Sequence, residues 1–173
     1  MAREVLKRTK PDVTVHHITG KDRHVSLSRP FVLRFHHIDT FIARMRNALK
    51  GQRSFDASLQ GHRIFVNDEG TRTFGGLLVS KGKEIFQSMI RQVDKTLEEF
   101  RQPPYYKEAI PHISVVWRLG AIDGGPAAME APVISKESRG PPSSRSSSLS
   151  PLGFRVSRVE CRIGNRLFDM RLL

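Results

Sequence analysis

Two tripeptides in the chain combine side chains that transfer protons with side chains that bind phosphate. They are His24-Val-Ser26 and His112-Ile-Ser114. An imidazole has an ordinary pKa of roughly 6.5, so at neutral pH one histidine can accept a proton while another donates one. Serine hydroxyls can donate hydrogen bonds to phosphate oxygens on which charge develops. This set suits metal-free opening or closing of an RNA phosphodiester: one histidine takes the proton of the 2′-hydroxyl, and the other protonates the departing 5′-oxygen.

That chemistry requires both tripeptides to face one cleft, and the surrounding residues predict a strand for each. Alternate residues of a strand share a face, so each histidine points to the same side as the serine two positions later. Two such strands side by side place two imidazoles and two hydroxyls around one cleft. The alternative interpretation is a pair of half-buried histidines that hydrogen-bond only to the backbone.

The remaining pattern predicts an α+β fold in which two helices pack on antiparallel strands. Apolar residues recur at intervals of three and four over residues 39–51 and 83–100, which indicates amphipathic helices. Gly61 is interpreted as a bulge, residues 67–70 as a turn, and Gly75-Gly76 as a site of close packing. Strands are expected over residues 12–19, 24–28, 31–35, 55–66, 72–80, 113–119, 154–161 and 166–173.

The composition changes sharply after residue 120. Residues 121–151 contain eight serines, five prolines and three glycines, which predicts a flexible insert. The chain is therefore divided into a core over residues 1–120 that carries both tripeptides, the insert at 121–151, and a hairpin over 152–173 that returns to the core.

The chain is strongly basic, with 29 Lys and Arg against 17 Asp and Glu and a net charge of +12. This balance favours a polyanion partner, with RNA or DNA first and an acidic membrane surface second. A basic surface that only keeps the protein soluble is the alternative. No segment approaches the ~18 apolar residues of a membrane span, and the polar start of the chain predicts no signal peptide. The single cysteine excludes an internal disulfide, and without a metal-ligand motif no metal or other cofactor is expected.

The paired tripeptides resemble the motifs of the 2H phosphoesterase superfamily. Longer segments are similar to its U6 small nuclear RNA phosphodiesterases: HVSLSRPFVLRFHHI, NDEGTRTFGGLLVS, VDKTLEEF and YYKEAIPHISVVW, with a weaker match at RVSRVECRIGNRLFDM. The resemblance implies two lobes of antiparallel sheet with helices outside and the active cleft between them. It implies a metal-independent 3′-to-5′ exoribonuclease that trims the oligouridine tail of U6 RNA and leaves a 2′,3′-cyclic phosphate or 3′-phosphate end. It also implies a nuclear location and a role in RNA processing for splicing, and a monomer is expected.

The resemblance also assigns roles to individual residues. His24 and His112 match the catalytic pair, with His112 as the base and His24 as the acid of the cleavage step. Ser26 and Ser114 match the hydroxyls that bind phosphate, and Tyr106 matches an aromatic residue that stacks on a nucleobase.

Further residues are expected to contact the substrate. Pro111 and Ile113 flank the second histidine. Asp68 lies where the family's hairpin loop touches the terminal uridine, although its residue type differs from the one expected there. Arg72 is interpreted as structural, with a phosphate contact as the alternative.

The chain departs from the family pattern in two places. Only 23 residues precede His24, where the family usually has another strand and helix, and the family's last helix would fall within residues 121–151. Both differences are expected of a truncated form or an isoform. Two alternatives to the exonuclease therefore stay open: a 2′,3′-cyclic phosphodiesterase of the same superfamily, and an RNA-binding relative with impaired catalysis.

Overall fold

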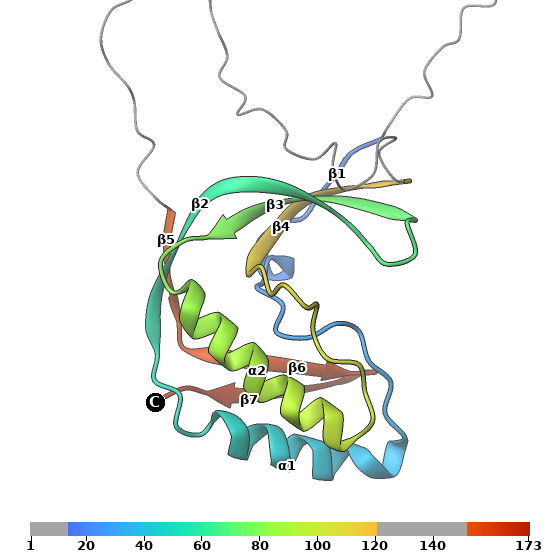
Figure 1. Ribbon diagram of the computed structural model, residues 1–173, viewed down its shortest axis with the longest axis vertical. Coiled ribbons are helices and arrows are strands. Elements are labelled where there is room, and N and C mark those ends of the chain that lie inside the picture. The colour runs from blue at the N-terminus through green and yellow to red at the C-terminus, as the bar shows by residue number, and fades with distance from the viewer. Residues whose placement is uncertain (1–13, 121–151) are drawn as a thin grey trace, which may run out of the picture.

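The structure, a computed structural model, describes residues 14–120 and 152–173 and has an α+β architecture (Figure 1). Two α-helices, seven strands and two short 3₁₀ helices make up this part of the chain. In chain order they are β1 (His16–His17), η1 (Gly20–Asp22), η2 (Phe35–His37), α1 (Ile38–Leu49), β2 (Phe55–Val66), β3 (Arg72–Val79), α2 (Lys83–Glu99), β4 (His112–Leu119), β5 (Leu152–Val156), β6 (Arg158–Ile163) and β7 (Arg166–Arg171).

The strands form two antiparallel sheets. The larger sheet has the order β1-β4-β3-β2-β5, and β6 and β7 form the second, two-stranded sheet. The long strand β2 curves along the side of the molecule, so the larger sheet curls toward the hairpin and the helices (Figure 1). The predicted fold class is confirmed.

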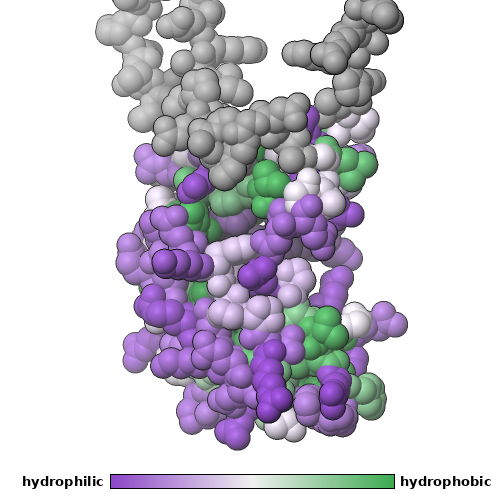
Figure 2. All heavy atoms as spheres, turned by 45° about the vertical axis from the view of Figure 1, so that its right-hand side comes forward, coloured by the Kyte–Doolittle hydropathy of each residue, from purple (hydrophilic) through white to green (hydrophobic). Residues whose placement is uncertain are grey.

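Both helices bury the apolar stripes that the sequence predicts. The buried residues of α1 are Ile38, Phe41, Ile42, Met45 and Leu49, and those of α2 include Phe86, Met89, Ile90, Val93 and Leu97. All of these residues except Ile90 share one core with residues of β2 and with the inward side chains of β6 and β7. Hydrophilic side chains cover most of the face seen in Figure 2, with hydrophobic patches between them. Among the described residues, no helix is long and apolar enough to cross a membrane.

Local predictions in the middle of the chain are confirmed. Gly61 has a φ of +78°, and the β2–β3 register shifts between Leu59 and His62, as a bulge requires. The turn at residues 67–70 closes with a hydrogen bond from the Gly70 amide to the Asn67 carbonyl.

Four predicted strands are wrong in extent. Of the strand expected over 12–19, the described part contains only His16–His17, and that over 24–28 is a single bridge at Val25. Residues 31–34 alternate between half-buried and exposed, but they belong to no strand and lead into η2. The segment 154–161 divides at Ser157, because β5 pairs with β2 in one sheet and β6 with β7 in the other. The predicted insert at 121–151 lies outside the described residues.

Candidate active site

A single antiparallel bridge between Val25 and Ile113 brings the two tripeptides together. In antiparallel pairing, the neighbours of this pair lie opposite each other, which places His24 across from Ser114 and Ser26 across from His112. Val25 and Ile113 pack against the hydrophobic core. Because side chains alternate along each segment, the two histidines and two serines lie on the opposite face.

Both histidines are oriented by the same local contact. The Nδ1 atom of His24 lies 2.8 Å from the carbonyl oxygen of Asp22, and that of His112 lies 2.8 Å from the carbonyl oxygen of Ile110. A carbonyl oxygen only accepts, so each Nδ1 carries a hydrogen and donates it. In its neutral form each imidazole therefore has a lone pair on Nε2 that can accept a proton, and in its charged form the Nε2–H group can donate one.

The sequence analysis missed Phe65, which holds the ring of His112. The two rings are stacked with centroids 3.8 Å apart and an angle of 15° between their planes. Gly76 makes room for this stack, because a Cβ atom there would lie 2.9 Å from Phe65 and 3.0 Å from His112. The signal in the sequence was the pair Gly75-Gly76, whose predicted close packing is confirmed.

The environment of His112 favours its neutral form. Burial lowers the pKa of His112, and the nearby His24 lowers it further, while the hydrogen bond to Ile110 acts in the opposite direction. His24 has an exposed side chain, whereas His112 is half-buried. The two imidazoles thus differ in solvation although their hydrogen bonds match.

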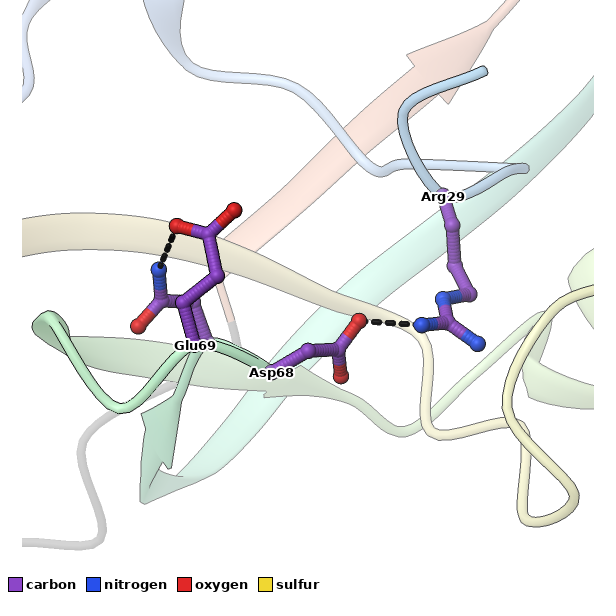
Figure 3. A network of polar contacts seen from close by, with 4 residues as sticks. Arg29, Asp68 and Glu69 are labelled. Carbon is purple, nitrogen blue, oxygen red and sulfur yellow. Dashed lines mark hydrogen bonds and ion pairs between the residues drawn. The ribbon is translucent and has the colours of Figure 1, made fainter.

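A second cluster contains two of the predicted substrate contacts, Asp68 and Tyr106, joined by Arg29. Figure 3 shows the pair of Arg29 and Asp68. The guanidinium group of Arg29 pairs with the Asp68 carboxylate and lies 4.7 Å from the centre of the Tyr106 ring. Burial raises the pKa of the Tyr106 hydroxyl, and the Asp68 charge adds to this effect. Tyr106 remains 45% exposed, so its ring is accessible to a ligand. No sequence pattern indicated a role for Arg29, because its two partners come from distant loops.

The side chains of Pro111 and Ile113 do not reach this face. Pro111 is fully buried and its carbonyl accepts a hydrogen bond from the Val79 amide at 3.0 Å, while Ile113 packs against the core. A substrate contact of either residue would have to involve the main chain. Within residues 14–120 and 152–173, no cluster of three or more His, Cys, Asp or Glu side chains is placed to hold a metal ion.

Comparison with known proteins shows the family to which this chain belongs. A family model named HVSL, described as an uncharacterised conserved protein, matches residues 3–171. The chain belongs to the HVSL family. Residues 24–27 of this chain read HVSL in one-letter code, like the family name, and this segment contains the first tripeptide.

Relatives of this HVSL chain have a common name. It is 32% identical over 149 residues to U6 snRNA phosphodiesterase 1 of Bos taurus, covering 86% of this chain and 55% of that protein. It is 33% identical over 118 residues to U6 snRNA phosphodiesterase 1 of Dictyostelium discoideum, covering 67% of this chain and 43% of that protein. The chain thus spans about half the length of these relatives.

The fold of the HVSL chain is also found in solved structures. Usb1 of Kluyveromyces marxianus aligns with a TM-score of 0.57 at 15% identity, covering 92% of this chain and 82% of that one. The same protein with uridine monophosphate aligns with a TM-score of 0.57 at 14% identity, covering 87% and 75%. The architecture is therefore that of Usb1, consistent with the 2H phosphoesterase-like fold expected from the sequence.

Proposed function

We propose that this chain is a metal-independent RNA phosphodiesterase that shortens RNA from its 3′ end, with the oligouridine tail of U6 small nuclear RNA as its substrate. The names of the relatives support this substrate, and uridine monophosphate in a Usb1 structure supports a uridine end. The observation that carries the catalytic part is the Val25–Ile113 bridge, which places both histidines and both serines on one face.

The cleavage step is an in-line attack within the RNA. The 2′-oxygen bonds to phosphorus, the bond from phosphorus to the 5′-oxygen breaks, and a 2′,3′-cyclic phosphate remains. Nε2 of one histidine takes the 2′-hydroxyl proton, and Nε2–H of the other gives a proton to the leaving 5′-oxygen. Both proton transfers take place at Nε2, because the Nδ1 hydrogen of each imidazole is committed to a carbonyl.

We assign His112 as the base of this step and His24 as the acid. Burial lowers the pKa of His112, so it is neutral and able to accept a proton at neutral pH. His24 is exposed to solvent, from which it can regain a proton after each turnover. Ser26 and Ser114, which lie opposite the histidines, donate hydrogen bonds to the phosphate oxygens, and Tyr106 stacks on a base.

The test is an oligouridine-tailed RNA incubated with the purified chain in excess chelator. The wild type should shorten the tail, and His24→Ala and His112→Ala should each reduce the rate by at least about 100-fold, the usual scale of general acid or base catalysis. His62→Ala is the matched control, because His62 is an exposed histidine on β2 outside both tripeptides. Equal activity of all three variants would exclude the proposed mechanism.

A second candidate is a 2′,3′-cyclic phosphodiesterase. The matching hydrogen bonds of the two histidines favour it, because the same pair in exchanged roles adds water to a cyclic end. Mass analysis of the products separates the two functions: net hydrolysis of cyclic ends without tail shortening indicates the second. Salt-dependent RNA binding without turnover would instead indicate an RNA-binding relative.

We also propose that the chain acts in the nucleus as a monomer. A nuclear site of action follows from the proposed U6 substrate. Microscopy of the tagged chain and light scattering of the purified protein test the two points separately.

A further inference from the structure

We infer that a hollow beside the two histidines binds a second nucleoside of the RNA chain. This inference rests on the proposed RNA phosphodiesterase function. The hollow has a volume of about 350 Å³ and lies at the β1–β4–β3 end of the larger sheet. Its lining residues are His17, Ile18, Thr19, Asp22, Arg72, Phe74 and Trp117. Its size is within the range of small-molecule sites.

Residues that line the hollow are close in sequence to the catalytic residues. Asp22 lines it, and the carbonyl of the same residue accepts the Nδ1–H hydrogen bond of His24. On the other side, Trp117 follows Ser114 along β4. A nucleotide next to the one at the catalytic histidines would therefore meet the hollow first.

A β-bulge turns Trp117 to the same face as the catalytic residues. In a regular strand, Ser114 and Trp117 would point to opposite faces, because they are an odd number of residues apart. Here Gly76 pairs with Ser114 and Gly75 with Val116, so Val115 has no partner on β3. The extra residue restores the alternation, and Trp117 lies opposite Phe74, two positions from Gly76 and roughly 7 Å along the strand.

Trp117, which lines the hollow, forms a stacked row with the neighbouring side chains of His16 and Arg72. The imidazole of His16 stacks on Trp117 with centroids 4.2 Å apart and an interplanar angle of 17°. The guanidinium of Arg72 lies 5.1 Å from the Trp117 ring centre. RNA-binding proteins stack unpaired bases on such aromatic rings and guanidinium planes. A nucleobase extends this row at either end.

The polar groups of the hollow suit a nucleoside better than a phosphate alone. Arg72 makes no ion pair within the described residues, so its donors are available to a base or a phosphate oxygen. Asp22 contributes a carboxylate that repels a free phosphate but accepts hydrogen bonds from a base edge or a ribose hydroxyl. The hollow therefore combines a surface for base stacking with hydrogen-bond donors and an acceptor, as a nucleoside site requires.

Trp117 is the only tryptophan of the chain, so its fluorescence reports on the hollow alone. The binding experiment uses His112→Ala, which keeps the RNA intact, and titrates it with a pentauridylate whose binding is followed by the anisotropy of a 5′ label. Trp117 emission should change with the same midpoint as the anisotropy. Full binding with unchanged emission overturns this inference alone, whereas failure to bind any RNA overturns the proposed function as well.

The kinetic experiment compares substrates with one and several nucleosides. Uridine 3′-(4-nitrophenyl phosphate) carries a single nucleoside, and a five-nucleotide RNA reaches the hollow. Trp117→Ala should lower the ratio of kcat/KM for the long substrate to that for the short one by about 5- to 150-fold. Arg72→Ala, a change at an exposed side chain, should lower the same ratio without unfolding the protein.

The matched control is Arg91→Ala, which removes the same charge from an exposed position on α2. It should leave the ratio unchanged. If Trp117→Ala and Arg72→Ala lower the melting temperature but keep the wild-type ratio, the stacked row only holds β1 on the sheet, and the inference is wrong.

Discussion

The ring of Phe65 on β2 lies parallel to the imidazole of His112 on β4, with centroids 3.8 Å apart. The intervening strand β3 has Gly76 at this place, so no side chain separates the two rings. Phe65 therefore covers one face of the proposed catalytic base and contributes to the burial that lowers the pKa of His112.

Replacing Phe65 should raise the pKa of His112. Phe65→Leu removes part of the cover, and water then stabilises the charged imidazole. Since a base must be neutral, kcat/KM rises with pH through this pKa, and the acid limb of the pH–rate profile should move to higher pH. NMR titration of the His112 ring in both proteins measures the shift directly.

The control for that experiment is Phe154→Leu, a similar loss of a partly buried ring from β5 without contact to His112. It should leave the titration of His112 unchanged. An equal shift in both variants would mean that general loosening of the fold, rather than the stacked ring, changes the pKa.

Gly76→Ala should reduce RNA cleavage by more than its loss of folding stability would explain. The new methyl group would lie 2.9 Å from Phe65 and 3.0 Å from His112, so one of the rings must move. Overpacking of this kind costs about 1–3 kcal/mol in the free energy of unfolding, and here the displaced group is the base. Urea unfolding and RNA cleavage are measured side by side.

Gly153→Ala is the comparison, because its Cβ would come no closer than 3.8 Å to the carbonyl oxygen of Ala57. This variant should retain both stability and activity. Full activity of Gly76→Ala would show that the position of His112 does not depend on the space above Gly76.

Cys161 should be unreactive in the native protein. Burial raises the pKa of its thiol to about 11, so at pH 8 almost none is present as the reactive thiolate. Alkylation by iodoacetamide should be slow in buffer and fast in urea, and treated native protein should keep its activity. Rapid modification of the native protein would place Cys161 at the surface instead of among the core residues of β6 and β7.

Periodicity was sufficient to predict the helices and long strands, because each buries an apolar face over many residues. It was not sufficient for residues 154–161, which were predicted as one strand although two successive polar residues, Ser157 and Arg158, break the alternation where the chain passes from one sheet to the other. The alternation of apolar and polar residues does not indicate which other strand a strand pairs with. The sheet position of a strand therefore needs the tertiary structure.

The candidate site, too, was only partly predictable from the sequence. The types and spacing of the His-x-Ser tripeptides indicated their chemistry, but their meeting depends on one bridge between Val25 and Ile113, far apart in the sequence. Phe65 and Arg29 were missed because each acts through a residue from another segment. Only the glycine pair at 75–76 left a local trace of such a contact.

The cluster of Arg29, Asp68 and Tyr106 leads to a final prediction. Arg29→Ala should raise KM for the RNA several-fold and leave kcat nearly unchanged, because the guanidinium holds the Tyr106 ring and the hairpin turn without belonging to the acid–base pair. Stability should change by less than about 1 kcal/mol, since exposed ion pairs contribute little. Arg155→Ala, which breaks the more exposed pair between Arg155 and Asp56 at 3.1 Å, removes the same charge and is the control that should leave KM unchanged. Steady-state kinetics of both variants decides the question, and an equal rise in KM for both would show that the effect is loss of positive charge rather than loss of the contact with Tyr106.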